Sequence, residues 1–563
     1  MIIGLDVGGT HTDVVLLNDK GFLKKVKVLT DPSDLFTTVL TGITELLEGI
    51  DPEKIKKIIL STTLTTNAIV QKNVNQVGII VSSGPGINPE LFKTDEHYYL
   101  VKGAIDHRGR ETEKINKEEI EGIAEKLKKD GIKYVAVVGK FSVRNPSHEI
   151  LIKRLLNKHF EKIFLGHNVS GNLNFPRRIS TTHLNASVYS MHKDFFQAVK
   201  ESLDKKGICA PIQVLKADGG TMSLDASIDF PAQTVLSGPA ASVVGSIPHA
   251  ESNQDTLVLD IGGTTTDITI LVDKVPILEP VGIRRGIYKS LIRSLKTYSE
   301  GIGGDSFVQV QEGELVIGPE RKGPAMAFGG SDPTPTDAIV FLGIMEEGDT
   351  ELAEQGIKKI ADQLDISTEE TAKLILKTTC EMIVDHSKAM VERINQKPVY
   401  TVHEFMEGYK IKPTRILLLG GPAKYFAQHI EEISGIKTRA VPLSSVANAI
   451  GAALARTTCE VSLIADTEQG VATVHEEDYA EPIANSFGKD DAMEIAYTIL
   501  KEKALAVGAS EEELEEIEVI EFQKFNIVRN FSPKGKIFRM KIQIKPGLVK
   551  GYENMKLETM EQD

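Results

Sequence analysis

Two segments of the chain share one pattern of apolar and polar positions. The first has mainly apolar residues at 2–5, the phrase Asp6-Val-Gly-Gly-Thr-His-Thr-Asp13, and apolar residues at 14–17. The second has apolar residues at 257–259, the phrase Asp260-Ile-Gly-Gly-Thr-Thr-Thr-Asp267, and mainly apolar residues at 268–271. Two apolar runs joined by a pair of glycines are typical of a β-hairpin with the glycines at its tip. The pattern therefore predicts the same hairpin twice.

The polar residues of each predicted tip suit a phosphate group. Glycine lets backbone N–H groups approach a ligand closely, and the threonine hydroxyls add donors beside them. The aspartate that opens each phrase would repel a bare phosphate, so it indicates an intervening cation, and Mg²⁺ binds both carboxylates and phosphate oxygens. A single copy would be better explained as a plain hairpin with a Gly-Gly turn. Two copies that agree at six of eight positions predict two similar lobes sharing one nucleotide.

Between the two phrases, apolar spacing predicts strands that alternate with helices from residue 77 to about 167, which indicates an α/β unit with a mainly parallel sheet. A long helix is predicted at about 177–206, followed by a strand that ends before Asp218-Gly-Gly. The segment Ser61–Asn67 is crowded with hydroxyl groups. It would either cap a helix through Thr66 or Asn67, or line a polar pocket, and the density of hydroxyls favours the pocket.

Two segments of small residues, 236–246 and 446–455, predict helices that pack closely and act as hinge elements between the lobes. After the second phrase come glycine-rich loops and a buried strand that breaks into Gly420-Gly421. The pattern then changes to short strands and one helix. We therefore expect a first lobe at 1–250 with an α/β insertion at about 70–180, a second lobe at 251–458, and a small α+β domain at 459–563.

Composition narrows the function further. The chain of 563 residues has a net charge of −14 and no basic cluster, which argues against nucleic acid and anionic membranes as partners. Its three cysteines are far apart, so they suit a reducing compartment and form no zinc or Fe–S motif. No apolar run approaches the ~18 residues of a membrane helix. The first residues belong to a predicted strand rather than a signal peptide, so we expect a cytoplasmic protein.

Several phrases along residues 1–456 are similar to those of one known family. They are Asp6–Asp13, Thr62–Ala68, Phe141–Glu149, Arg178–Ala186, Asp218–Gly220, Ser237–Ala240, Asp260–Asp267, Gly318–Glu320, Gly329–Gly330, Thr336–Ala338 and Gly420–Gly421. Together they resemble the A subunit of hydantoinase and 5-oxoprolinase, a family that includes an acetone carboxylase subunit and lies in the actin, sugar-kinase and Hsp70 superfamily. The chain departs from the family pattern at Leu60-Ser61, at Asp305 and at Arg321-Lys322, which leaves the ATP side intact.

The resemblance implies a two-lobed actin-like ATPase fold of the ribonuclease-H-like kind. It also implies ATP-dependent phosphorylation of the carbonyl oxygen of a cyclic amide (a lactam, a hydantoin or 5-oxoproline) or of a related carbonyl compound. A B-type subunit would complete ring opening or carboxylation, and the resemblance is compatible with a homo-oligomer.

These expectations assign roles to individual residues. Asp6 and Asp260 would hold Mg²⁺, and Asp218 is a candidate base. The ATP-binding residues would be Gly8, Gly9, Thr10, Thr12, Gly262, Gly263, Thr264, Thr265, Gly303, Gly304, Asp305, Gly420 and Gly421. For Gly420-Gly421 the alternative is a strand-to-helix turn. The acceptor would lie near Thr63, Thr66, Asn67, Thr182 and Asn185. Arg178 would steady an acidic substrate group or form a salt bridge on a helix surface.

Two other functions stay open. One is an ATP-gated conformational machine without a small-molecule acceptor, although the region after residue 461 displays no peptide-binding motif. The other is a reductive activator, which would need a cysteine-held cluster that three scattered cysteines do not indicate. No carboxylate occurs between Phe230 and Glu251, where ATPases of the superfamily carry the residue that activates water. We therefore expect slow ATP turnover until an acceptor binds.

Overall fold

The repeated phrase forms two β-hairpins, each within its own sheet. The computed structural model describes residues 1–9, 11–31, 33–279, 282–285, 288–396, 410–529 and 531–552. Strand β1 (Ile2–Val7) pairs antiparallel with β2 (His11–Asn18), and β13 (Asp255–Ile261) with β14 (Thr266–Val272). In each hairpin the first and last aspartates of the phrase are paired, Asp6 with Asp13 and Asp260 with Asp267. The hairpin prediction is confirmed in both copies.

The first sheet has six strands in the order β12-β11-β4-β1-β2-β3. Its remaining strands are β3 (Gly21–Leu29), β4 (Lys57–Thr62), β11 (Ile212–Leu215) and β12 (Thr221–Ser223). Helices α1 (Leu35–Leu46) and α6 (Phe175–Lys205) pack on one face and bury a common apolar core. Strands β1, β4 and β11 are parallel, so their carboxyl ends meet at one edge, where the candidate residues of this half gather.

A second sheet is inserted between β4 and β11. Its order is β10-β9-β5-β6, and all neighbours are parallel, which confirms the predicted α/β unit. The strands are β5 (Val77–Ser82), β6 (Tyr98–Leu100), β9 (Tyr134–Gly139) and β10 (Lys162–Leu165), with helices α3 (Lys117–Lys129) and α4 (Ser147–Leu156). The first half of α6 packs against β9 and its second half against the first sheet, so this long helix links the two sheets.

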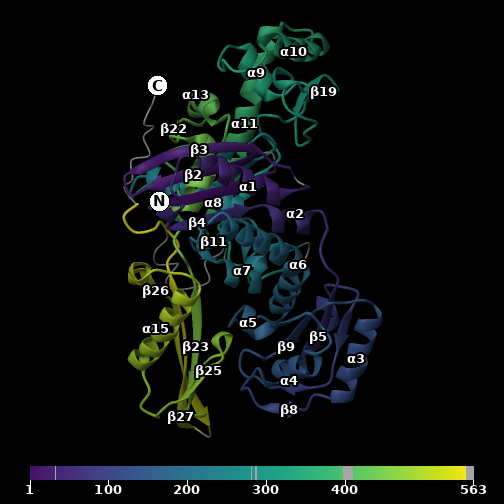
Figure 1. Ribbon diagram of the computed structural model, residues 1–563, viewed down its shortest axis with the longest axis vertical. Helices are drawn as coiled ribbons and strands as arrows, with labels where there is room; N and C mark the ends of the chain where they lie inside the picture. Colours follow the sequence, from purple (N-terminus) through teal and green to yellow (C-terminus); the bar gives the residue numbers. More distant parts are fainter. Residues whose placement is uncertain are drawn as a thin grey trace.

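The second hairpin belongs to a sheet with the order β15-β14-β13-β21-β22, in which β21 (Arg415–Leu419) and β22 (Lys437–Ala440) run parallel to β13. Its core is shared with α11 (Thr368–Asn395) and α13 (Ala423–Ser434). Helices α9 (Pro335–Phe341) and α10 (Thr350–Leu364) extend this half of the molecule upward in Figure 1.

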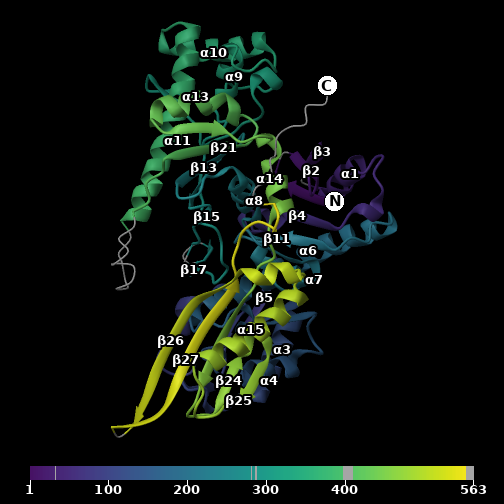
Figure 2. The same cartoon turned by 90° about the vertical axis from the view of Figure 1, so that its left-hand side faces the viewer.

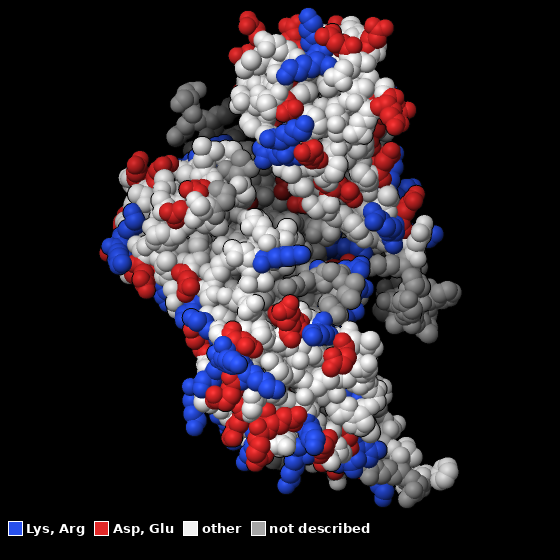
Figure 3. Space-filling model, turned by 90° about the vertical axis from the view of Figure 1, so that its right-hand side faces the viewer, with Lys and Arg blue, Asp and Glu red and all other residues white. Residues whose placement is uncertain are grey.

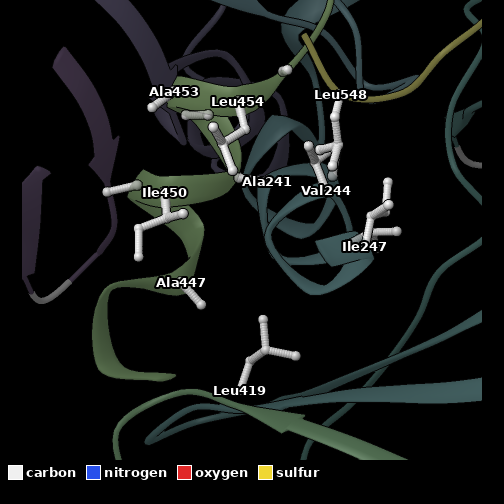
Figure 4. Packing of buried hydrophobic residues seen from close by; sticks show 14 of the residues in the cluster. Ala241, Val244, Ile247, Leu419, Ala447, Ile450, Ala453, Leu454 and Leu548 are labelled. Carbon is white, nitrogen blue, oxygen red and sulfur yellow. The ribbon is translucent and has the colours of Figure 1, made fainter. Parts of the chain in front are cut away.

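Helices α8 (Ser237–Ser246) and α14 (Ala447–Leu454) lie between the two hairpin-bearing sheets. Figure 4 shows their apolar side chains packed together with Leu419 of β21 and Leu548. Their backbones approach so closely that a Cβ on Gly451 would lie 2.0 Å from the carbonyl oxygen of Ala241. One on Gly245 would lie 2.2 Å from that of Ala447. The predicted close packing of the small-residue helices is confirmed.

The C-terminal residues form an antiparallel sheet in the order β25-β24-β23-β27-β26, covered by α15 (Lys489–Ala506). Its strands are β23 (Glu460–Asp466), β24 (Val471–Val474), β25 (Tyr479–Pro482), β26 (Ile517–Arg529) and β27 (Ser532–Ile544). The β26–β27 hairpin projects from the body of the molecule (Figure 2). Shorter elements include α2 (Leu64–Val70), α5 (Gly166–Val169), α7 (Leu224–Asp229), β15 (Val275–Pro276), β18 (Tyr298–Glu300), β19 (Val308–Gln311) and β20 (Glu314–Ile317).

Two surface properties bear on partners. Among the described residues, none of the helices is long and apolar enough to cross a membrane. On the face drawn in Figure 3, acidic and basic side chains of the described residues are interspersed rather than separated into areas of one sign.

Candidate functional site

Helix α14 brings Asn448 to the opening aspartate of the second phrase. Asn448 donates from Nδ2 to Asp260 Oδ2 at 3.3 Å, and its amide also opposes the rise in the pKa of Asp6 that burial causes. Ser242 of α8 donates from Oγ to the same Asp260 oxygen at 2.5 Å and lies 3.0 Å from Asn448 Oδ1. Neither Asn448 nor Ser242 was predicted as a site residue, because each lies in a helix whose only sequence signal was its small residues.

The environment of Asp6 disfavours a negative charge. Asp6 is 7% exposed, and burial, with repulsion from Asp13 and Asp260, raises its pKa to about 7. Burial and the neighbouring Asp260 likewise raise the pKa of Asp267 to about 7. A bound cation would relieve this repulsion.

The donor set fits Mg²⁺. Asp6 Oδ1 is buried and has no hydrogen-bond partner among the described residues, which leaves one carboxylate oxygen for a ligand. The described residues contain no cluster of three or more carboxylate, histidine or cysteine side chains that would form an all-protein metal cage. Mg²⁺ is usually held by one or two carboxylates and keeps several waters, so the pair Asp6 and Asp260 suits this ion.

The tip of the second hairpin is braced by the loop that contains Gly303. Gly304 N donates to Gly262 O at 2.9 Å, and Asp305 N donates to Gly263 O at 2.7 Å. A Cβ on Gly303 would lie 2.5 Å from Gly262 O, so only glycine permits this approach. Gly303 and Gly304 therefore support the tip through its backbone.

Arg321 lies beside the second tip and was not predicted as a site residue. Its Nη2 donates to Asp305 at 2.8 Å, and its Nη1 is 3.5 Å from Thr264 Oγ1 in that tip. Burial lowers the pKa of His11 in the first tip, and the charges of Lys27 and Arg321 add to this effect. A guanidinium beside such a tip would suit phosphate oxygens. Thr10 of the first tip lies outside the described residues.

Gly420 and Gly421 lie against the second phrase. Gly420 has a φ of +95°, and a Cβ there would be 2.1 Å from Ile261 O and 2.9 Å from Asp260 Oδ1. Packing thus requires glycine at 420, as the strand-to-helix turn alternative implies. Around Gly421 a Cβ would meet nothing within 4 Å, so there is open space beside Asp260. Adenosine binding at this position stays a prediction.

The hydroxyl-rich segment forms the end of β4 and the first turns of α2. Thr63 donates from Oγ1 to Val7 O at 3.1 Å, and Asn67 donates from Nδ2 to Thr63 Oγ1 at 3.2 Å. Thr66 Oγ1 accepts from Leu236 N at 2.9 Å, at the start of α8. Helix α2 begins at Leu64, so the capping position is Thr63, which makes no side-chain capping bond. Thr66 and Asn67 lie inside the helix, and the alternative that one of them caps it is therefore wrong.

Three predicted contacts need correction. Thr12 is fully buried with its hydroxyl 3.0 Å from Thr30 Oγ1, so its side chain faces the core rather than a nucleotide. Thr182 is also fully buried and donates to Arg178 O within α6 at 2.7 Å. Thr12 and Thr182 are each flanked by polar residues in the sequence, so no apolar pattern shows which way their side chains point. Only tertiary packing decides which side of the strand or helix is buried.

Arg178 is the third. It is fully buried, and its guanidinium donates to Gly139 O at 2.9 Å and to Lys140 O at 2.5 Å. It also donates to Ser142 Oγ at 2.5 Å and lies 3.9 Å from Glu149. Both predicted roles, a substrate contact and a surface salt bridge, are wrong because Arg178 ties α6 to the loop after β9.

Asp218 and Asn185 line a cavity of about 130 Å³ between α6, residues 291–293 and the C-terminal sheet. Asp218 Oδ1 accepts from Gly220 N at 3.0 Å, and Oδ2 accepts from Lys216 Nζ at 3.4 Å. Burial would raise the Asp218 pKa, but Lys216 and Arg293 hold it below its usual range. A carboxylate with a lowered pKa is a poor proton acceptor, which favours a positioning role over that of a base.

The fold matches that of a solved enzyme structure. A nucleotide-free structure of acetone carboxylase aligns over 98% of this chain and 88% of that chain, with a TM-score of 0.69 and 16% identity. At that identity the likeness shows the fold alone, a mixed α/β architecture shared with that carboxylase.

Family models identify the chain more closely. Residues 2–160 match the hydantoinase/oxoprolinase N-terminal region, and residues 178–461 match hydantoinase/oxoprolinase. The chain therefore belongs to the hydantoinase/oxoprolinase family. It is 26% identical to an uncharacterized protein of Methanocaldococcus jannaschii, over 67% of this chain and 62% of that protein. It is 23% identical to the caprolactamase subunit alpha of Pseudomonas jessenii, over 78% and 68%. The matches thus span about two thirds of the length of these relatives.

Proposed function

We propose that this chain is a two-lobed, actin-like ATP-dependent enzyme subunit that phosphorylates the carbonyl oxygen of a cyclic amide or of a related carbonyl compound. The observation that carries the proposal is the pair of equivalent antiparallel hairpins, in which Asp6 is paired with Asp13 and Asp260 with Asp267. The relatives support it, since one is a subunit of a caprolactamase and another is an acetone carboxylase studied for ATP-dependent carboxylation.

The proposed roles follow from position. Asp6 and Asp260 would hold Mg²⁺, while Gly8, Gly9, Gly262 and Gly263 would face phosphate oxygens from the two tips. Bound Mg²⁺ supplies charge neutralisation at the transferring phosphoryl group. The chain's own contribution is positioning: Ser242 and Asn448 orient Asp260, and Arg321 lies beside the second tip. Thr63, Thr66 and Asn67 would form the first-lobe wall next to the nucleotide.

A carbonyl acceptor suits the polar groups of this site. A carbonyl oxygen can attack phosphorus through its lone pair and loses no proton, unlike water or an alcohol. Helix α8 begins at Ser237, and its first turn contains no carboxylate that would activate water. The pKa of Asp218 is lowered rather than raised, so this carboxylate is a poor base. These features support slow hydrolysis of ATP by water and faster transfer to a positioned acceptor.

A partner subunit would complete the reaction, and the projecting hairpin is a candidate contact for it. Phe525, Val528 and Phe531 on β26–β27 are 49%, 59% and 103% exposed. Large apolar side chains exposed together usually mark an interaction surface. We therefore propose that a B-type hydantoinase subunit covers this hairpin.

Acceptor-dependent turnover tests the function. The purified chain should release ADP or AMP slowly from Mg²⁺-ATP, and a suitable lactam, hydantoin or ketone should raise the rate at least about tenfold, because the bound acceptor supplies a positioned nucleophile. Fast hydrolysis that is indifferent to all of these acceptors would contradict the proposal. It would favour the ATP-gated conformational machine instead.

A further inference from the structure

A carboxylate of the protein lies against the tip of the second hairpin. Asp305 N donates to Gly263 O at 2.7 Å, which holds this residue beside the tip. A Cβ on Gly263 would lie 2.6 Å from Asp305 Oδ2, so this side-chain oxygen packs against the backbone of the tip. The same oxygen accepts from Arg321 Nη2 at 2.8 Å. Asp305 thus places a negative charge where the proposed function puts a phosphate group.

The tip itself offers donors to an anion. The backbone N–H groups of Gly263 and Thr264 have no hydrogen-bond acceptor among the described residues, and Thr264 is exposed. Successive N–H groups at a turn form a concavity that favours anions. A phosphate group bound there would lie close to the Asp305 carboxylate. Because like charges repel, and do so more strongly away from bulk water, the carboxylate opposes the binding of that phosphate.

Arg321 is placed to serve either anion. Its Nε donates to Gly323 O at 3.2 Å, and its Nη1 already lies 3.5 Å from Thr264 Oγ1. The side chains of Arg321 and Asp305 are 25% and 19% exposed, so the pair is partly shielded from water but still open to a ligand. A guanidinium fork binds carboxylate and phosphate oxygens alike. Arg321 can therefore exchange one anion for the other without moving the hairpin.

The carboxylate depends on this partner. Burial raises the pKa of Asp305, and the charge and the hydrogen bond of Arg321 oppose that rise. A phosphate that takes over the guanidinium therefore leaves Asp305 with a charge that its surroundings disfavour. Loss of this ion pair is a cost that every nucleotide has to meet when its phosphates bind at the second tip.

We propose that Asp305 is a built-in competitor of the nucleotide, which pairs with Arg321 while no phosphate is bound and yields it to a phosphate at the second tip. The inference rests on the proposed function and specifies how the affinity of its nucleotide site is set. The pair weakens the binding of phosphates and leaves contacts to the nucleoside unchanged. A positioning role, in which Asp305 holds Arg321 ready for phosphate, would have the opposite effect on affinity.

Calorimetric titration of the full chain with a non-hydrolysable ATP analogue and Mg²⁺, and with adenosine, tests the inference. Asp305→Asn removes the charge and keeps the backbone bond to Gly263, so the analogue should bind at least about tenfold more tightly. Adenosine, which has no phosphate, should bind as it does to the wild type. Asp305→Ser also removes the charge and should give the same gain, so it decides the question if the asparagine variant unfolds.

Asp332→Asn is the matched control. Asp332 pairs with Lys322, the neighbour of Arg321, at 3.7 Å, and the two side chains are 32% and 38% exposed. The substitution therefore changes the net charge of the chain by the same amount and removes the adjacent ion pair. Affinity for the analogue should equal that of the wild type. A gain equal to that of Asp305→Asn would mean that general charge is responsible and would overturn the inference.

Arg321→Gln separates exchange from plain repulsion. This variant should bind the analogue at least about tenfold more weakly, because the phosphate loses its guanidinium. Adding Asp305→Asn to it should restore less than about threefold, since there is no longer a cation to release. A full tenfold gain in this background would show that Asp305 acts without Arg321 and would overturn the exchange.

Unchanged or weaker binding of the analogue in both Asp305 variants would overturn the inference and favour the positioning role. The proposed function would then still stand, because the wild type would bind the analogue. If neither the wild type nor any variant bound the analogue, the proposed function would fall together with the inference.

Discussion

Replacing Gly451 with alanine should force apart the two helices on which the candidate nucleotide site is built. A Cβ at this position would lie 2.0 Å from Ala241 O and 2.5 Å from Gly245 N, whereas ordinary contact begins near 3.4 Å. The overlap with the carbonyl oxygen is therefore 1.4 Å deep. Both contacted atoms belong to the backbone of α8, so no side-chain rotation can relieve them, and the helices themselves must move.

Two energetic effects oppose one another. Alanine is favoured over glycine within a helix by about 1 kcal/mol. Overpacking of a close-packed core costs about 1–3 kcal/mol and occasionally more. Because the clash is with backbone at the closest crossing of α8 and α14, we expect the upper end of that range and a net loss of about 2 kcal/mol. Asn448 precedes Gly451 by one turn, so its bond to Asp260 should lengthen.

Thermal unfolding and Mg²⁺-ATP turnover of Gly451→Ala, measured beside Gly238→Ala, check this reasoning. Gly238 lies in the first turn of α8, where a Cβ would meet only Thr63 Cγ2 at 3.9 Å, so this control should be at least as stable as the wild type and should turn over ATP at the wild-type rate. We expect Gly451→Ala to melt several degrees lower and to turn over ATP at least about tenfold more slowly. Wild-type stability and turnover in Gly451→Ala, or equal damage in both variants, would refute the account of the helix crossing.

Three further predictions test other parts of the molecule. Asp6→Asn and Asp260→Asn should each reduce Mg²⁺-ATP turnover by about 100-fold or more, since each removes charge that positions the ion. The exposed control Asp19→Asn should keep the wild-type rate, and a normal rate in either site variant would show that its aspartate does not belong to the site. Arg178→Ala should lower stability by about 3–5 kcal/mol in denaturant titrations, because it breaks a buried ionic network, and an altered acceptor KM without a stability loss would contradict its structural role. Burial lowers the pKa of His192 to about 3 in the folded chain, below the value of about 6.5 in the unfolded chain. Below about pH 6.5 the unfolded chain therefore binds a proton that the folded chain does not, and the wild type loses stability as the pH falls. His192→Gln should therefore lose about 2 kcal/mol less than the wild type between pH 7 and pH 5, and parallel pH profiles would count against this burial.

Local patterns predicted the individual elements well. The long helix predicted at about 177–206 is α6, which spans Phe175–Lys205. Both hairpins and the alternating strands and helices of the inserted sheet were also predicted correctly. The helix and the hairpins follow from hydrogen bonds and apolar spacing between near neighbours, so the sequence contains their signal.

The predicted candidate site was less complete, because its polar contacts join distant segments. Asn448 and Ser242 meet Asp260 only after α8 and α14 cross, although 206 positions separate the two in sequence. Arg321 reaches the second tip through a contact with Thr264 across 57 positions. Neither neighbourhood produces a local pattern that distinguishes these side chains from ordinary helix or loop residues.

Arg178 shows most clearly what the sequence determined and what the tertiary structure decided. The sequence placed it in a long helix, because backbone hydrogen bonds and side-chain spacing within α6 define the helix locally. Whether that position faces solvent, substrate or core depends on the loop after β9, whose carbonyl oxygens Gly139 O and Lys140 O approach the guanidinium from 39 and 38 positions away. Secondary structure is set by near neighbours in the chain, whereas the burial and the charge partners of a side chain are set by whichever distant segments pack against it.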